Sequence, residues 1–320
     1  MKKTLSLIIA AAAFIAISVS VISCSKERRE FKKEDGQVSR DNKEIQSSID
    51  DVTNEANRIL SDNSLMSGKG NENDEALAYL NNICGYTVDT TQRPQGILII
   101  NFDGTTNCNG RIRAGQVKLT LENYVNGARW RDTGAVVKVE YINYKVTRVS
   151  DNKSLTFNGI KNITNVSGGN AVLLILGFQN SLVHRVVGNN IQVKFDDGST
   201  ATFNLARKWT HTWSNNVYTV KGEGEGSQNG KNNLENWGTT RDGDNFTSQV
   251  LEPVIWNSTC GAHKPVSGKL DIVVDAKDFS FLTTFGVDNS GNVVTGSCPW
   301  GLKVEWTYKN KTGTKLYPYN

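Results

Sequence analysis

The chain has 320 residues and a formal net charge of +4, from 36 Lys and Arg against 32 Asp and Glu. A charge this balanced argues against nucleic acid as a partner, because nucleic-acid-binding proteins carry a basic face or stripe. The length is ample for a large core, and 29 glycines against 5 prolines suit short strands joined by turns.

Residues 1–23 have the layout of a secretory signal peptide. Two lysines follow the first methionine, the run from Leu5 to Ile22 is almost wholly apolar, and the small Ser23 precedes Cys24. This end resembles the lipobox of bacterial lipoproteins, which implies cleavage before Cys24 and acylation of that cysteine. Cleavage would remove the two lysines and lower the net charge from +4 to +2. The alternative is an uncleaved transmembrane helix, for which the run is long enough.

An acylated Cys24 would hold the mature chain on a membrane through its buried acyl chains. No second apolar run of membrane length follows, so we expect a water-soluble body in the bacterial cell envelope, at the outer membrane. Residues 24–75 are predicted to be a charged spacer, because the stretch from Ser25 to Asp35 is dense in charged residues of both signs. Such a stretch is either a plain tether or an export tag, and charge alone does not separate the two.

Within that spacer, apolar residues recur at steps of three and four and predict a helix over 41–62, with Asp41 as its N-cap. The stripe consists of Ile45, Ile49, Val52, Ala56 and Leu60. An isolated helix with one narrow apolar stripe is weakly stable in water. We therefore expect the helix to dock on the body, to pair with another chain, or to stay marginal.

The β-rich body is predicted over 76–320, where apolar residues alternate with polar ones as in half-buried strands. An Asp-Gly turn at 197–198 between two such runs predicts a hairpin. Opposite parity on the two sides of Tyr141 predicts a bulge. The more continuous apolar run from Ala171 to Phe178 is counted with the strands. We predict an all-β antiparallel fold, either a sandwich or two packed β-units.

Four further cysteines, Cys84, Cys108, Cys260 and Cys298, suggest disulfides in an exported chain. Three pairings are possible, and we favour Cys84–Cys108 with Cys260–Cys298, because each pair brackets one strand-turn segment. Buried thiols or a metal site are the alternatives, although neither pair has the short CxxC spacing that zinc favours. Similar turns around the two pairs indicate either two related β-units or chance reuse of Gly-rich turns.

Several short motifs resemble those of an uncharacterised family of β-rich bacterial envelope lipoproteins. They are Cys84–Asp89, Ile99–Gly104, Cys108–Arg113, Arg131–Gly134 and Gly268–Leu270, together with Cys260 and Cys298. The resemblance covers most of 80–308 in patches and implies an exported, all-β protein. It implies no activity, ligand or catalytic residue. The long charged tail before Cys84 departs from the family pattern.

The segment around Trp209, His211 and Trp213 is the best candidate for ligand binding. In a strand these side chains point to one face, and an aromatic row with an imidazole could stack against sugar rings. Trp237, Trp256 and Trp300 are candidates to extend such a surface. The alternative is ordinary core, because large aromatic side chains dominate buried faces. Burial is favoured by Ala201, Phe203 and Leu205, which share the parity of the row.

Catalytic chemistry has little support in the sequence. His184 and His211 have no His or Cys nearby, and His263 has only Cys260, so no metal site and no cofactor are predicted. No GxSxG motif marks a serine hydrolase. A glycosidase would need two carboxylates a few ångströms apart. The nominees are Asp103, Glu140, Asp242 and Asp244.

Three functions follow, in order of preference. The first is a lipid-anchored, non-catalytic envelope protein with a structural or interaction role, in contact with an envelope protein. The second is a surface module that binds polysaccharide through Trp209, His211 and Trp213. The third is a hydrolase with an unrecognised carboxylate site, because an all-β fold does not itself argue for catalysis.

Overall fold

The computed structural model describes residues 37–61, 84–261 and 264–319. The predicted signal peptide 1–23, the predicted acylation site Cys24 and His263 lie outside these residues. Residues Val38–Asn320 form one compact unit, so the helix that the sequence places in the spacer is grouped with the β-rich body. No helix in the described ranges is both long and apolar enough to cross a membrane.

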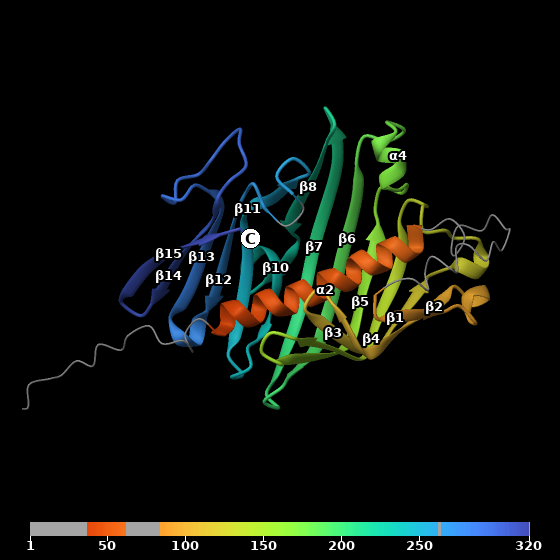
Figure 1. The fold of residues 1–320 in the computed structure, drawn as a ribbon, viewed down its shortest axis with the longest axis horizontal. Coiled ribbons are helices and arrows are strands. Elements are labelled where there is room, and N and C mark those ends of the chain that lie inside the picture. Colours follow the sequence, from red (N-terminus) through yellow and green to blue (C-terminus); the bar gives the residue numbers. More distant parts are fainter. Residues whose placement is uncertain (1–36, 62–83, 262–263, 320) are drawn as a thin grey trace, which may run out of the picture. The chain divides into compact units, whose positions relative to one another are not determined.

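The strands of the described residues are all joined in one antiparallel sheet (Figure 1). They are β1 (Tyr86–Asp89), β2 (Ile97–Cys108), β3 (Arg111–Leu121), β4 (Ala135–Arg148), β5 (Ser154–Asn165), β6 (Leu182–Phe195), β7 (Thr200–Ser214), β8 (Val217–Gly224), β9 (Gly226–Gln228), β10 (Lys231–Thr239), β11 (Asn245–Asn257), β12 (Ser267–Val274), β13 (Phe279–Val287), β14 (Gly301–Tyr308) and β15 (Lys311–Pro318). The all-β prediction is confirmed. The strands form a single sheet instead of being divided between two packed sheets.

The second layer of the fold is a helix, α2 (Gln37–Ser61), which lies across one face of the sheet (Figure 1). We call this face the inner face. The apolar spacing predicted a helix over 41–62 with Asp41 as its N-cap, but the helix begins at Gln37, so Asp41 lies inside it and pairs with Arg241. The predicted stripe is buried against the sheet, with Ile49 and Val52 each 1% exposed. A helix thus covers the apolar side of the central strands, which is the role the sequence analysis gave to a second sheet.

The strand order is sequential from β1 to β7 and then changes. Two short strands, β8 and β10, both lie between the long strands β7 and β11. β10 pairs with residues 202–205 of β7, and β8 pairs with residues 207–214. The ladder is therefore interrupted at Ala206, where one short strand ends and the other begins. Arg207, on the inner face, is the next residue along β7.

Local sequence signals account for the turns. The Asp-Gly turn joins β6 to β7 as predicted, and the register of β4 against β5 shifts between Tyr141 and Tyr144, which confirms the predicted bulge. Strand β3, which pairs with the other edge of β4, needs a glycine at this bulge. A β-carbon on Gly115, whose φ is +84°, would overlap the carbonyl oxygen of Asn143.

The short helical elements are α4 (Ala171–Ile175), η1 (Arg93–Gln95), η2 (Tyr124–Asn126) and η3 (Asp275–Lys277). The run from Ala171 to Phe178 is therefore not a strand, as its continuous apolar character had suggested. The side chain of Asn170 accepts a hydrogen bond from the amide of Leu173 and caps one helical turn. This turn lies beyond the end of β5 and the start of β6 (Figure 1).

The predicted disulfides Cys84–Cys108 and Cys260–Cys298 are both present, with Cα–Cα separations of 5.8 Å and 5.2 Å. Each encloses two antiparallel strands joined through a 3-10 turn, β1–β2 in one case and β12–β13 in the other. The two hairpins lie towards opposite ends of the strand order. They share a local plan and are parts of the same sheet.

Candidate functional site

The predicted row of Trp209, His211 and Trp213 lies on the inner face of β7. The buried Ala201, Phe203 and Leu205 precede it with the same parity. All three side chains are half-buried. They are therefore neither the fully shielded core nor the open platform that the sequence left as alternatives.

Rings from two neighbouring strands join the row, and we call the resulting group the aromatic face. It consists of Trp209, His211, Trp213, Tyr218 and Trp256. The sequence analysis did not place Tyr218 here, because the pairing of Trp213 with Tyr218 depends on the insertion of β8 beside β7. The rings of Trp209 and Trp256 lie 5.5 Å apart at 48°.

A glycine lies beneath these two indoles. A β-carbon on Gly222 would come within 2.9 Å of the Trp209 ring and 3.3 Å of the Trp256 ring. The missing side chain thus leaves the space that the two indoles fill. The arrangement places apolar ring surface beside a polar imidazole, which is the chemistry a sugar-binding surface uses.

The imidazole of His211 connects the aromatic face to a buried histidine. Nδ1 of His211 and the hydroxyl of Tyr218 share a hydrogen bond of 2.9 Å. On the other side, the His211 ring lies 5.6 Å from that of His184, which in turn lies 5.6 Å from the ring of Trp130. His184 is 7% exposed, and its Nε2 has no hydrogen-bond partner among the described residues.

Burial keeps both imidazoles neutral. Burial lowers the pKa of His211 to about 4, and burial together with the adjacent His211 lowers the pKa of His184 to about 3. Neither ring therefore carries a charge at neutral pH. A ligand at the aromatic face would meet neutral hydrogen-bonding groups, which suits hydroxyl groups better than ions.

These shifts predict that acid destabilises the protein. Between the folded pKa values and the unfolded value near 6.5, the unfolded chain binds more protons, so the free energy of unfolding falls as the pH falls. For His184 alone the loss between pH 7 and pH 5 is about 2 kcal/mol. Urea unfolding at the two pH values measures it, and His184→Gln should remove that share of the loss. An equal loss in the variant would contradict the assignment.

Beside Trp209, towards the helix, the inner face changes from aromatic to charged. Arg207 is 3% exposed and bonds Oδ1 of Asp50 on α2 at 2.9 Å, and its Nε lies 3.8 Å from Oε2 of Glu235. The other oxygen of Glu235 accepts hydrogen bonds from Gln46, Asn236 and Ser248. No local sequence pattern reveals this cluster, because its members come from four separate segments.

The cluster belongs to a wider pattern between α2 and the sheet. All five acidic residues of α2 lie within 4 Å of an arginine of the β-rich body, four of these arginines on strands and Arg241 in the β10–β11 turn. The contacts are Asp41–Arg241 at 2.7 Å, Glu44–Arg148 at 2.7 Å, Asp50–Arg207 at 2.9 Å, Asp51–Arg111 at 2.5 Å and Glu55–Arg113 at 3.6 Å. An acidic helix therefore lies on an arginine-rich sheet face, and this match specifies where the helix docks as well as which side it buries.

A lysine is also sealed under the helix. Lys161 is 1% exposed, and its Nζ donates to the carbonyl oxygen of Ile49 at 2.7 Å and to the hydroxyl of Thr53 at 2.5 Å. Burial lowers the pKa of Lys161 to about 7, against the opposing pull of Asp50. The amine thus ties the sheet to two positions on consecutive turns of α2.

The lowered pKa of Lys161 predicts an alkaline rise in stability. Between pH 7 and pH 9 the unfolded lysine remains protonated while the folded one loses its proton, so the free energy of unfolding increases with pH. The expected rise is about 2 kcal/mol. Guanidinium unfolding at pH 7, 8 and 9 measures it, with Lys161→Met as the variant that should lack the rise. A flat profile in the unsubstituted protein would contradict the prediction.

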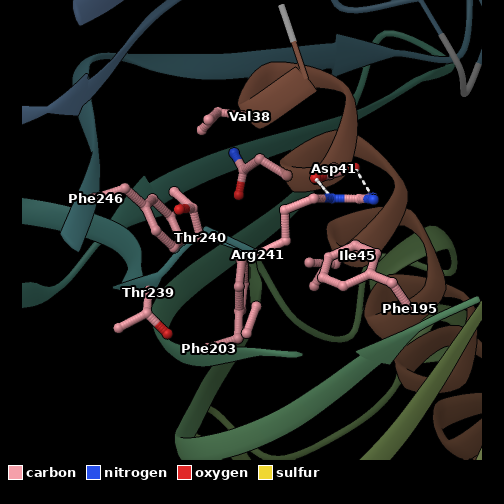
Figure 2. A pocket seen from close by; sticks show the side chains of 11 residues that line it. Val38, Asp41, Ile45, Phe195, Phe203, Thr239, Thr240, Arg241 and Phe246 are labelled. Carbon is pink, nitrogen blue, oxygen red and sulfur yellow. Dashed lines mark hydrogen bonds and ion pairs between the residues drawn. The ribbon is translucent and has the colours of Figure 1, made fainter. Parts of the chain in front are cut away.

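A narrow pocket lies beside the N-terminal half of α2 (Figure 2). It is bounded by the helix, the last residues of β6 and β10, and the first residues of β7 and β11. Arg241 forms one wall, with its guanidinium 3.9 Å from the centre of the Phe195 ring and two hydrogen bonds to Asp41. The remaining lining is mostly apolar. The pocket has room for about one water molecule, so we interpret it as a packing gap beside the docked helix.

The carboxylates nominated for hydrolysis are held by other groups. Asp103, at the register shift of β2 against β3, accepts hydrogen bonds from Thr105 and Thr106, which lower its pKa to about 2. Asp242 and Asp244 both bind the amine of Lys277, at 2.6 Å and 2.9 Å. Glu140 lies on β4, opposite Lys118 of β3. The structure thus brings two of the candidate carboxylates together, Asp242 and Asp244, but both are paired with a lysine.

In the described part of the chain, no three His, Cys, Asp or Glu side chains gather as metal ligands. No protein-family model, no curated protein and no solved structure matches the chain. The site is therefore interpreted from its own geometry.

Proposed function

We propose that this protein is a lipid-anchored, non-catalytic protein of the bacterial cell envelope, located at the outer membrane, with a body that acts by contact. The pairing of every acidic residue of α2 with an arginine of the β-rich body carries the non-catalytic part. The charged groups of the inner face are engaged in holding the helix. Two disulfides support an oxidising compartment, and the lipobox pattern supports the anchor.

Acylation of Cys24 tests the anchor directly. The full chain is produced in a bacterium that processes lipoproteins, the membranes are separated on a density gradient, and the N-terminal peptide is weighed. We expect an acylated peptide that begins at Cys24 in the outer-membrane fraction. Cys24→Ala should leave the protein unacylated. An unsubstituted chain that begins at Met1, or that carries no lipid, would contradict the proposal.

A second candidate is polysaccharide binding at the aromatic face. It is favoured by the half-buried rings of Trp209 and Trp213 next to the neutral His211. Stacking on such rings contributes about 0.5–1.5 kcal/mol beyond area burial. If a soluble envelope polysaccharide binds, Trp213→Ala should weaken binding by roughly 2- to 10-fold.

Trp300 offers the matched control, because it is 40% exposed and lies in the β13–β14 connection, away from the aromatic face. Trp300→Ala should leave the affinity unchanged. The two variants are compared by titration calorimetry against the same polysaccharide. Equal affinities in Trp213→Ala and the unsubstituted protein would remove the aromatic face as the binding site.

A further inference from the structure

The segment between β5 and β6, residues 166–181, is the most apolar exposed part of the described chain. We call it the α4 loop. Four large apolar side chains point into solvent there: Val172 at 60% exposure, Ile175 at 47%, Leu176 at 63% and Phe178 at 77%. Exposed apolar side chains grouped this closely mark a contact surface.

The α4 loop is anchored to the rest of the fold by a buried side chain and by hydrogen bonds at its base. Leu174 points inward and is 2% exposed. The amide of Asn165 donates to the carbonyl oxygens of Trp130 and Gly169, and the backbone amide of Gly169 donates to the carbonyl of Arg131. The apolar side chains are therefore presented on a fixed base.

Two properties of the loop fit a lipid bilayer. Residues 162–184 contain no Asp, Glu, Lys or Arg, so immersion would bury no charge. The α4 turn also pairs backbone amides internally, because those of Leu173, Leu174, Leu176, Gly177 and Phe178 all donate within it. Backbone groups that are paired internally are what an apolar medium requires.

The predicted anchor would keep a bilayer within reach. Gln37, the first residue of α2, follows Cys24 by 13 positions, and a chain of that length spans at most about 45 Å when fully extended. An acylated Cys24 would therefore hold the body close to the membrane surface.

We propose that the α4 loop inserts Val172, Ile175, Leu176 and Phe178 into the interfacial region of the bilayer that holds the lipid anchor. This inference rests on the proposed anchor at Cys24. It gives the body a second membrane contact, and it orients the sheet so that the end of β5 and the start of β6 face the lipid. One acyl anchor and one apolar loop together bind more stably than either alone.

The test uses the acylated full chain with one engineered cysteine. The four body cysteines are disulfide-bonded, so Phe178→Cys can be labelled with an environment-sensitive nitrobenzoxadiazole dye. The matched control is Val149→Cys, which is 45% exposed in the turn at the opposite end of β5. Both proteins are added to vesicles of phosphatidylethanolamine and phosphatidylglycerol, and flotation is measured alongside.

We expect the dye at position 178 to shift to the blue and brighten roughly twofold or more, as a dye does on entering the interface, while the dye at 149 does not change. Adding Leu176→Asp should abolish the response at 178 without preventing flotation. Flotation with no difference between the two dyes would overturn the loop insertion and leave the anchor standing.

Two further results would also overturn the inference. A chain that carries no lipid and does not float would remove the anchor and, with it, the inference. A dye response at 178 that requires no vesicles and increases with protein concentration would show that a second copy of the chain covers the loop.

Discussion

Replacing Arg207 with alanine is expected to destabilise the protein by about 3–5 kcal/mol. Arg207 is buried between Asp50 and Glu235, and the side chain of Glu235 is only 12% exposed. Without the guanidinium, Glu235 keeps a buried charge with no cation beside it. The loss is measured as the difference in unfolding free energy from urea titration at pH 7.

Arg185 offers the matched control for this prediction. Its guanidinium also bonds one carboxylate, that of Glu225, through two nitrogens at 2.6 Å and 3.2 Å. Its side chain is 53% exposed, so Arg185→Ala should cost only about 0.2–1 kcal/mol. Similar losses in the two variants would show that the Arg207 cluster is solvated, contrary to its burial.

Ile49→Ala is expected to cost about 2–5 kcal/mol, because it removes buried methyl groups and leaves a cavity between helix and sheet. Ile49 lies in the middle of α2 and is 1% exposed. The substitution should lower the midpoint of urea unfolding without changing the number of transitions. A single transition is expected because helix and sheet share one core.

Lys43→Ala separates packing from helix propensity. Lys43 is exposed on the same helix, and alanine is the better helix former. We expect a change within about 0.5 kcal/mol. A loss in Ile49→Ala no larger than this would mean that α2 is not packed on the sheet.

The local elements of the fold could be predicted from the sequence because their signals are local. Alternation marked the strands, the Asp-Gly turn marked the β6–β7 hairpin, and the spacing of Ile45 to Leu60 marked the helix. The favoured disulfide pairing is also confirmed. Each of these signals lies within a few dozen residues of its partner.

The single sheet could not be predicted in the same way. Alternation shows that one face of a strand is buried but does not show what covers it, so a second sheet and a docked helix fit equally well. The covering helix lies in a charged segment that reads as a spacer. Only the three-dimensional match between its five acidic residues and the arginines of the β-rich body shows its role.

The candidate site, too, could be predicted only in part. The parity of Trp209, His211 and Trp213 indicated a shared face, and the structure places them together. Tyr218 and Trp256 join them because β8 lies between β7 and β11. That strand order is long-range information, and alternation along one strand does not contain it.

The central claim of this account is that α2 is an integral layer of the fold, held by its apolar stripe and its arginine contacts. Native-state hydrogen exchange of the amides in the middle turns of α2 tests it most directly. We predict that Ile49, Val52 and Ala56 exchange with the same free energy as the core amides of β4 to β7, the free energy of global unfolding. Exchange of the helix amides at a free energy several kcal/mol lower, with the strands still protected, would show that the helix detaches on its own and would contradict the account.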